Sequence, residues 1–546
     1  MKSSKKKQST ASLVADWEAL QRIFIRPEND QGKDRLVKYM EQILFGLHDF
    51  LREHVGITED VSLQELSDRY MDSDINCLPS RKLADVIKGI IDNIAPHAVN
   101  VASPYFIGHM TSAIPFFMVH LHTIVAALNQ NVVKLETSKV VSIWERQLIS
   151  KIHRLVFQKD DSFYQTHIQN PESTLGAFIE DGTLANLTAM WVARNKLFSE
   201  CDGFKGIEIE GFSRALNVYK KKRAVILVSK MAHYSLRKSG GLLGIGNENV
   251  IRIPINNRFQ VDKDILENQI KELTNNNVAI IAVIAIAGTT ETGTIDPIHE
   301  IADICEKYTI HFHVDAAWGG PTLLSEKYSH LLSGLDRADS VTVDGHKQFY
   351  MPMSCGMVYF KDPQAMDAVA YHSAYVNRPG SVDLGIRSIV GSRAATSLVL
   401  GNALEIMGKK GYALLIDHGI ELTKQFADEI QKRPLFELIS EPQLNILTYR
   451  IIPEPIRKKW GTVSFEEKQI LNETVNQINI RLQRLQRQAG KSFVSRTTIE
   501  KDGLKQVVLR SVLMNPMTTM SIIVEILDEQ ELIFVNHLKE RSLECH

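Results

Sequence analysis

The order of apolar and polar residues along the chain divides it into three regions. From Ala11 to about Val101, apolar side chains recur at steps of three and four residues, as in residues 36–44, which predicts amphipathic helices. Polar breaks at residues 58–60 and 79–81 separate these helices. The first region is therefore interpreted as a helical arm or cap.

In the middle region, short apolar and β-branched segments alternate with helical ones. Strands are predicted at residues 224–229, 278–287, 310–315, 340–343 and 356–360. Helices are predicted between them, at residues 184–198, 263–274 and 298–308. This alternation is typical of an α/β fold with a largely parallel sheet covered on both faces. In such sheets, ligands bind beyond the carboxyl ends of the strands.

The third region begins after residue 394 with a helical segment at 395–407, which ends at the glycine-containing residues 408–411. Strand and helix patterns then alternate to about residue 535. The length of 546 residues fits two or three domains. We expect an N-terminal helical arm or cap at 1–110, a large α/β domain at 111–394 and a smaller α+β domain at 395–546.

Composition narrows the functional classes. The chain has 63 basic and 64 acidic residues, so no overall field would draw it to nucleic acid or a membrane surface. Its longest apolar run, residues 278–287, is shorter than the roughly 20 residues of a membrane helix. The lysine-rich start lacks the apolar segment of a secretory signal. The five cysteines form no CxxC pair, which favours a cytoplasmic protein and indicates no metal site.

Two polar residues follow predicted strands of the middle region. Asp315 ends the strand at 310–315, and Lys347 comes shortly after the strand at 340–343. A carboxylate there can keep a pyridine nitrogen protonated, and a lysine can form an imine with the aldehyde of the same ring. These are the two tasks that a pyridoxal-phosphate enzyme requires of its protein. Taken alone, Asp315 could equally well cap the next helix, and a lone lysine such as Lys347 is far more often a solvated surface charge.

A phosphate site is indicated where residues 178–186 turn from a short strand into a helix. Gly182 and Thr183 stand at the predicted helix start, where free amides, the helix dipole and a hydroxyl suit an anion. A plain helix cap by Asp181 or Thr183 is the alternative. His346, beside the lysine, could bind the same phosphate or act as a neighbouring cation.

Two further positions fall at the same predicted edge of the sheet. His233 follows the strand at 224–229, where an imidazole can stack on a ring and steer protons, although a lone histidine after a strand is more often a structural group. Thr289 follows the longest strand and places a hydroxyl at the expected crevice.

Together these segments resemble the group II pyridoxal-phosphate-dependent amino-acid decarboxylases, the family of the glutamate, aromatic amino-acid and cysteine-sulfinate decarboxylases. The resemblance extends from about residue 104 to residue 516. It rests on residues 229–235, 287–290, 313–320 and 344–347. It implies the fold-type I, aspartate-aminotransferase-like architecture, a homodimer with active sites at the interface, and an N-terminal arm exchanged between subunits.

The resemblance also implies roles for individual residues. Lys347 would be the Schiff-base lysine, Asp315 the partner of the pyridine nitrogen, and His233 the stacking residue. The remaining cofactor contacts would come from Ala317 beneath the ring and from Gly182, Thr183 and His346 at the phosphate.

Substrate contacts follow from the same resemblance. Arg510 corresponds to the arginine that binds the substrate α-carboxylate. Residues 372–380 correspond to a mobile catalytic loop, in which Tyr375 would protonate the carbanion after carbon dioxide leaves. Tyr371 is an alternative proton donor, and an ordinary surface loop is an alternative for the whole segment.

One segment departs from the family pattern. Glutamate decarboxylases have Phe-Asn-Gln-Leu-Ser where this chain has Ile-Gly-His-Met-Thr at residues 107–111. We expect His109 and Thr111 to line the pocket for the substrate side chain, with Arg393 as a further donor.

The pattern is closest to decarboxylases of acidic L-amino acids. L-Aspartate, giving β-alanine for pantothenate, is the first expectation for the substrate. L-Glutamate, cysteine sulfinate and 2,4-diaminobutyrate are the alternatives. A fold-type I aminotransferase and a non-catalytic cofactor-binding protein are the other classes.

Overall fold

The computed structural model describes residues 30–53, 62–372, 381 and 383–538. The chain divides into two compact units, residues 1–106 with 484–493 and residues 107–483 with 494–546. The predicted division at 110 and 394 stays a prediction. Within the described ranges, no helix is both long and apolar enough to cross a membrane.

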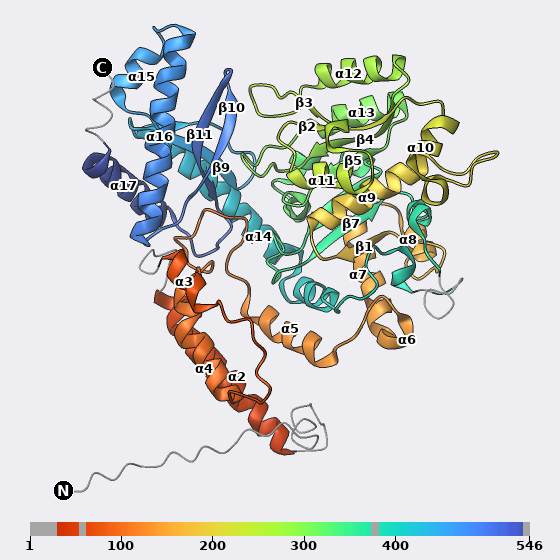
Figure 1. Cartoon of the computed structure of the whole chain (residues 1–546), viewed down its shortest axis with the longest axis horizontal. Coiled ribbons are helices and arrows are strands. Elements are labelled where there is room, and N and C mark those ends of the chain that lie inside the picture. Colours follow the sequence, from red (N-terminus) through yellow and green to blue (C-terminus); the bar gives the residue numbers. More distant parts are fainter. Residues whose placement is uncertain (1–29, 54–61, 373–380, 382, 539–546) are drawn as a thin grey trace. The chain divides into compact units, whose positions relative to one another are not determined.

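The first unit is helical, as its sequence pattern predicts (Figure 1). Its helices are α2 (Asp30–Glu53), α3 (Leu63–Arg69) and α4 (Leu83–Asn93). Helices α2 and α4 pack closely at Gly46, where an added Cβ would lie 2.2 Å from the Ile91 side chain. A capping box between Ser62 and Glu65 starts α3.

The second unit contains a seven-stranded sheet in the order β1-β7-β6-β5-β4-β2-β3. Its strands are β1 (Gly176–Ile179), β2 (Ala224–Ser229), β3 (Val250–Ile253), β4 (Ala279–Ile286), β5 (Phe312–Asp315), β6 (Ser340–Asp344) and β7 (Gly356–Phe360). The strands from β3 to β6 pair in parallel, whereas β7 is antiparallel to both of its neighbours. The predicted largely parallel sheet is confirmed.

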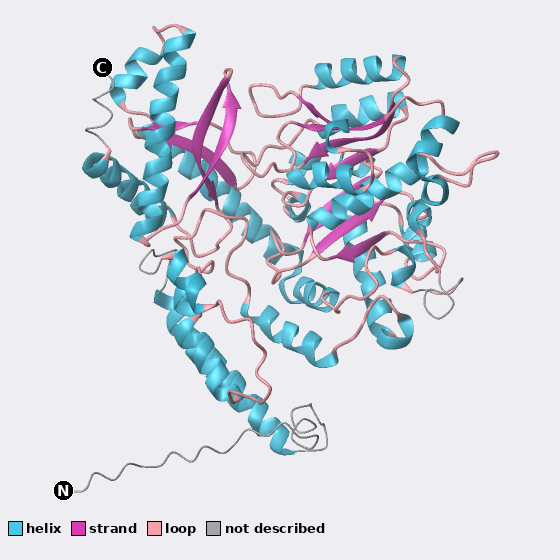
Figure 2. Ribbon diagram, viewed as in Figure 1, coloured by secondary structure: helices cyan, strands magenta, loops and turns pink. Residues whose placement is uncertain are grey.

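Both faces of this sheet are buried, which explains its nearly continuous apolar strands. In β2, Val225 and Leu227 pack into one hydrophobic cluster with residues of helices α7 (Val140–Phe157), α12 (Lys263–Asn275) and α13 (Ile298–Tyr308). The alternate residues Ile226 and Val228 pack into another cluster with residues of helices α9 (Gly182–Leu197), α10 (Ile207–Val218) and α11 (Tyr234–Leu242). Figure 2 shows the helices on both sides of the strands.

The helices of this part precede or connect the strands. They are α5 (Phe116–Leu128), α6 (Leu135–Ser138), α7 (Val140–Phe157), α8 (Asp161–His167), α9 (Gly182–Leu197), α10 (Ile207–Val218), α11 (Tyr234–Leu242), α12 (Lys263–Asn275) and α13 (Ile298–Tyr308). Aspartate side chains cap three of them. Asp160 accepts from the Phe163 amide at α8, Asp181 from the Leu184 amide at α9, and Asp262 from the Asp264 and Ile265 amides at α12.

The C-terminal part of the second unit has an antiparallel sheet in the order β10-β11-β9-β8. Its elements are α14 (Ser397–Lys432), β8 (Phe436–Leu438), β9 (Ile446–Ile451), α15 (Glu454–Trp460), α16 (Phe465–Ala489), β10 (Ser495–Lys501), β11 (Leu504–Val512) and α17 (Met520–His537). The predicted break near Gly408 is a kink: its φ of 62° and ψ of 176° interrupt α14, which then resumes.

Candidate active site

A crevice of about 220 Å³ lies beyond the carboxyl ends of the central strands. This is smaller than the roughly 300–1,000 Å³ of pockets for drug-sized ligands, and suits a compact ring with a few substituents. The lining residues come from five strand ends and the helices that follow them. Those central to the site are Gly182, Thr183, Asn186, His233, Thr290, Asp315, Ala317, Asp344, His346 and Lys347.

Lys347 lies in this crevice beside a buried acid. Its Nζ is 3.0 Å from Oδ2 of Asp344, the last residue of β6, and its side chain is 21% exposed. The amine is therefore reachable from the crevice while paired with a carboxylate. His346 lies on the other side of the same acid, with its Nε2 3.7 Å from Oδ2, while its Nδ1 lies 2.7 Å from the Cys355 carbonyl oxygen.

Asp315, at the end of β5, is held in one orientation by two donors. The Asn186 amide donates to Oδ2 at 2.8 Å, and the Ala317 backbone N–H donates to Oδ1 at 3.2 Å. Asn186 lies on α9, so this helix fixes the carboxylate from one side. A buried, oriented carboxylate of this kind can hold a protonated ring nitrogen.

Behind Asp315, a chain of hydrogen bonds continues through the sheet. Asn186 Oδ1 lies 3.1 Å from His313 Nε2, and His313 Nδ1 lies 2.8 Å from the Ser340 hydroxyl. The same hydroxyl lies 2.8 Å from His311 Nε2. Burial lowers the pKa of His313 to about 3, so this imidazole is neutral at pH 7 and carries a single N–H.

His233 immediately precedes α11 at the edge of the crevice. Its Nδ1 accepts from the Ser235 amide at 3.3 Å, which orients the ring. Burial lowers its pKa, an effect that the nearby Asp315 opposes and the nearby Lys347 adds to. The ring is thus predominantly neutral, and a flat neutral ring at this place is suited to stacking.

The start of α9 forms another wall, as its sequence predicts. The Asp181 side chain accepts from the Leu184 amide at 2.9 Å. The amides of Gly182 and Thr183 lie in the first turn of the helix and therefore have no intrahelical acceptor. Gly182 is needed for space, because an added Cβ would lie 2.8 Å from Oδ2 of Asp344. Both the capping and the anion-binding interpretation of this segment are therefore compatible with its geometry.

The loop after β4 contributes Thr290 to the crevice lining, whereas Thr289 is absent from it. The Thr289 hydroxyl is fully buried and lies 2.8 Å from the Thr292 hydroxyl within the same loop. Ala317 lines the crevice, and its small side chain leaves room for a ring.

None of the three candidate substrate residues, Arg510, His109 and Thr111, is among the residues that line the crevice. Arg510, on β11, donates to the carbonyl oxygens of Thr290 and Gly108 at 2.9 and 3.0 Å. His109 follows Gly108, and partial burial together with the charges of Arg510 and Lys347 lowers its pKa. Met110 and not Thr111 lines the crevice.

Of the three other candidates, the structure describes two. Tyr375 lies outside the described residues. The Tyr371 hydroxyl donates to Glu208 at 2.5 Å, and this tyrosine is not among the crevice residues. Arg393 forms a buried ion pair with Glu145 and is likewise not among them.

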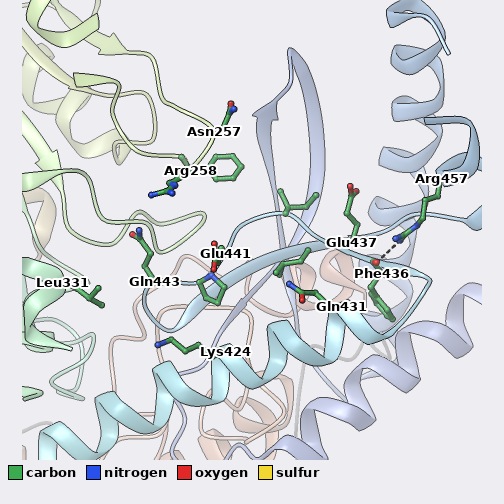
Figure 3. A pocket seen from close by; sticks show the side chains of 14 residues that line it. Asn257, Arg258, Leu331, Lys424, Gln431, Phe436, Glu437, Glu441, Gln443 and Arg457 are labelled. Carbon is green, nitrogen blue, oxygen red and sulfur yellow. Dashed lines mark hydrogen bonds between the residues drawn. The ribbon is translucent and has the colours of Figure 1, made fainter. Parts of the chain in front are cut away.

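A larger hollow of about 960 Å³ lies next to β8 and the loop before β9 (Figure 3). Lys424, Glu437 and Arg457 are among its lining residues. Two of the polar side chains there have partners of their own: Arg457 donates to the Phe436 carbonyl oxygen, and Glu437 pairs with Arg450. No histidine of the described residues lines this hollow, so it does not combine lysine, carboxylate and imidazole as the crevice at the strand ends does.

Sequence reasoning missed two residues of the crevice, Asn186 and Asp344. Both lie inside segments that carried predictions, at the end of 178–186 and at the start of 344–347. Asp344 could have been found from its spacing of three residues from Lys347. Asn186 could have been found as a polar residue among the buried positions of α9.

Comparisons with known proteins agree with this geometry. Residues 71–452 match the pyridoxal-dependent decarboxylase conserved domain. The chain is 42% identical to the aspartate 1-decarboxylase of Aliivibrio fischeri, over 94% of each chain. It is 28% identical to the L-2,4-diaminobutyrate decarboxylase of Acinetobacter baumannii, over 67% of this chain and 71% of that protein.

Among solved structures, apo mouse CSAD superposes with a TM-score of 0.78 at 24% identity, over 91% of this chain and 99% of that one. The glutamate decarboxylase domain from Vibrio parahaemolyticus superposes with a TM-score of 0.76 at 22% identity, over 95% and 99%. These likenesses confirm the predicted fold-type I architecture. The chain belongs to the pyridoxal-dependent decarboxylases, and its cofactor is pyridoxal phosphate.

Proposed function

We propose that the protein removes the α-carboxyl group of L-aspartate and releases β-alanine. The observation that carries this proposal is the 42% identity to an aspartate 1-decarboxylase, which extends over 94% of both chains. Such a substrate brings two carboxylates. Arg510, which donates to the crevice residue Thr290, and His109, which precedes the crevice residue Met110, would provide donors for an acidic amino acid of this size.

The crevice suits pyridoxal phosphate by its own chemistry. When bound, the cofactor supplies an electron sink for the bond that breaks. Lys347 would hold its aldehyde carbon, Asp315 its ring nitrogen, and His233 and Ala317 the two faces of its ring. The amides of Gly182 and Thr183, with His346, would hold its phosphate.

Asp315 would act as an electrostatic group. Its carboxylate is held in one orientation by two donated hydrogen bonds, so it can stabilise a proton on the ring nitrogen throughout the reaction. Thr289 is a weaker candidate for cofactor binding, because its hydroxyl lies against Thr292 within its own loop.

Arg510 would bind the α-carboxylate and orient the bond to be broken. Its guanidinium is half-buried and bonds two carbonyl oxygens, of Thr290 and Gly108, so its position is fixed from both sides. His109 would bind the side-chain carboxylate of the substrate. An approaching anion favours protonation of the imidazole, which can then donate a charged hydrogen bond to it. Thr111, two residues after His109, is a further candidate for binding the substrate side chain.

Tyr375 would return a proton to Cα after carbon dioxide leaves. Support for this role comes from the sequence pattern of residues 372–380 alone. Tyr371 is the weaker candidate, because its hydroxyl is bound to Glu208.

We further propose a cytoplasmic homodimer. Support comes from α5, whose apolar side chains are exposed although they belong to a helix of almost wholly apolar sequence. Phe116 is 77% and Ile124 51% exposed. An apolar helix face of this kind favours burial against another chain, and a second copy is the simplest partner.

The test is a panel of L-amino acids with the purified, cofactor-loaded protein, read by chromatography of the amine product. β-Alanine from aspartate should form faster than the products of glutamate, cysteine sulfinate and 2,4-diaminobutyrate. The variant Lys347→Ala should form none, whereas Lys424→Ala, a matched lysine in the hollow of Figure 3, should retain turnover. A faster product from another acid, or a keto acid without carbon dioxide, would refute the proposal.

A further inference from the structure

Asp344 combines deep burial with an unsatisfied oxygen. The residue is 2% exposed. Its Oδ2 has Lys347 Nζ at 3.0 Å, but its Oδ1 has no hydrogen-bond partner in the described part of the chain. A buried polar atom without a partner is costly, and in native proteins it usually has a role.

Both carboxylate oxygens lie against the start of α9. An added Cβ on Gly182 would be 2.8 Å from Oδ2 and 2.9 Å from Oδ1. This is the helix start whose amides are proposed to hold the cofactor phosphate. An ionised Asp344 would therefore face a second anion at short range in a poorly solvated place, which favours protonation of one of the two.

The other titratable groups around Asp344 do not remove this repulsion between the carboxylate and the phosphate. They are Lys347 and His346 from the same loop, Asp315 from β5, Asp181 before α9, His233 before α11 and Cys355 before β7. Burial raises the pKa of Asp344 and Asp315 raises it further, whereas Lys347 and His346 lower it. Lys347 is the group that would bond the cofactor aldehyde, so its ion pair with Asp344 is the contact most altered by binding.

We propose that Asp344 takes up one proton from solvent when pyridoxal phosphate binds, so that the cofactor phosphate meets a neutral carboxylic acid. The proton adds to Oδ1, the oxygen without a partner, and turns it from an acceptor into a donor. Oδ2 remains an acceptor for the Lys347 side. This inference rests on the proposed placement of the phosphate at the start of α9.

The test compares cofactor affinity across pH in wild type and Asp344→Asn. The apoprotein is titrated with pyridoxal phosphate between about pH 6 and 9, and the dissociation constant is read from protein fluorescence. Protons taken up on binding weaken affinity as pH rises, by up to about tenfold per pH unit for one proton. Because groups other than Asp344 titrate alike in both proteins, wild type should lose up to about tenfold more affinity per unit than Asp344→Asn. Parallel curves would overturn the proposal.

Two further measurements separate the possible failures. Pyridoxal, which lacks the phosphate, should give the same pH dependence in both proteins, and an equally large difference with pyridoxal would overturn the role of the phosphate. The infrared difference spectrum of wild type should gain a protonated carboxyl band on addition of pyridoxal phosphate, and its absence would overturn the proposal even if the variant did not fold. Failure of the proposed function would give a different result. If Lys347 did not form the imine with the cofactor, Lys347→Ala would bind pyridoxal phosphate with the same visible absorbance as wild type.

Discussion

Asn186 joins the carboxylate at the ring-nitrogen position to the rest of the protein, and its replacement by leucine should weaken both stability and cofactor binding. The change removes the 2.8 Å bond to Asp315, the 3.1 Å bond to His313 and the 3.2 Å bond to the Ser235 hydroxyl. A hydrogen bond to a charged group contributes about 1.5–3 kcal/mol and a neutral one about 1 kcal/mol. Asn186→Leu should therefore lower the free energy of unfolding of the apoprotein by about 3.5–5 kcal/mol.

The matched control is Asn195→Leu on the same helix. Asn195 is also buried and also bonds a charged group: its amide donates at 2.7 Å to the Ala368 carbonyl oxygen and its Oδ1 accepts from the Arg194 guanidinium at 2.9 Å, away from the crevice. We expect a loss of about 2.5–4 kcal/mol for this variant. Urea unfolding followed by tryptophan fluorescence measures both losses, and equilibrium dialysis measures cofactor affinity. Asn186→Leu should bind pyridoxal phosphate at least about tenfold more weakly, equivalent to about 1.4 kcal/mol, whereas Asn195→Leu should bind it normally. Equal stability losses with unchanged cofactor affinity in both variants would refute the reasoning.

Three further predictions concern acid, space and assembly. The His313 pKa of about 3 lies below its unfolded value of 6.5, so the contribution of the neutral imidazole to the free energy of unfolding is complete above pH 6.5 and declines as pH falls. By about pH 4.5 the free energy of unfolding should have fallen by about 3 kcal/mol through this group. In urea unfolding, His313→Gln should lose correspondingly less stability than wild type between about pH 7 and 4.5. Gly182→Ala should destabilise the apoprotein by about 1–3 kcal/mol and weaken cofactor binding, whereas Gly461→Ala, which has open space around it, should change neither in calorimetry and dialysis. Phe116→Ser with Ile124→Ser should shift sedimentation from dimer to monomer, and an unchanged sedimentation coefficient would contradict the proposed use of α5.

The central sheet was predictable because its strands are buried on both faces. The bounds of β2 and β7 match their apolar segments, since polar residues limit both runs. The edge strand β3 was missed because it has four residues and only part of it is buried. The antiparallel direction of β7 was also missed, because apolar composition does not encode strand direction.

The candidate site was predictable where chemistry follows a strand end and less so elsewhere. Lys347, Asp315 and His233 lie in the crevice because the carboxyl ends of their strands share one edge of the sheet. The sequence did not show whether Thr289 or Thr290 faces the crevice. Neighbouring residues point in different directions, and a one-residue shift exchanges which of them does so. Asn186 required knowledge of a contact across 129 positions of the sequence, which periodicity does not contain.

The segment at residues 107–111 is attached to the same strand that carries Arg510. The Val512 amide donates to the Ile107 carbonyl oxygen at 2.6 Å, and Arg510 donates to Gly108. The residues proposed to select the substrate side chain and to bind its α-carboxylate are thus joined by direct hydrogen bonds. Laboratory evolution toward a new acid should therefore vary both segments jointly, since a change in either one displaces the other.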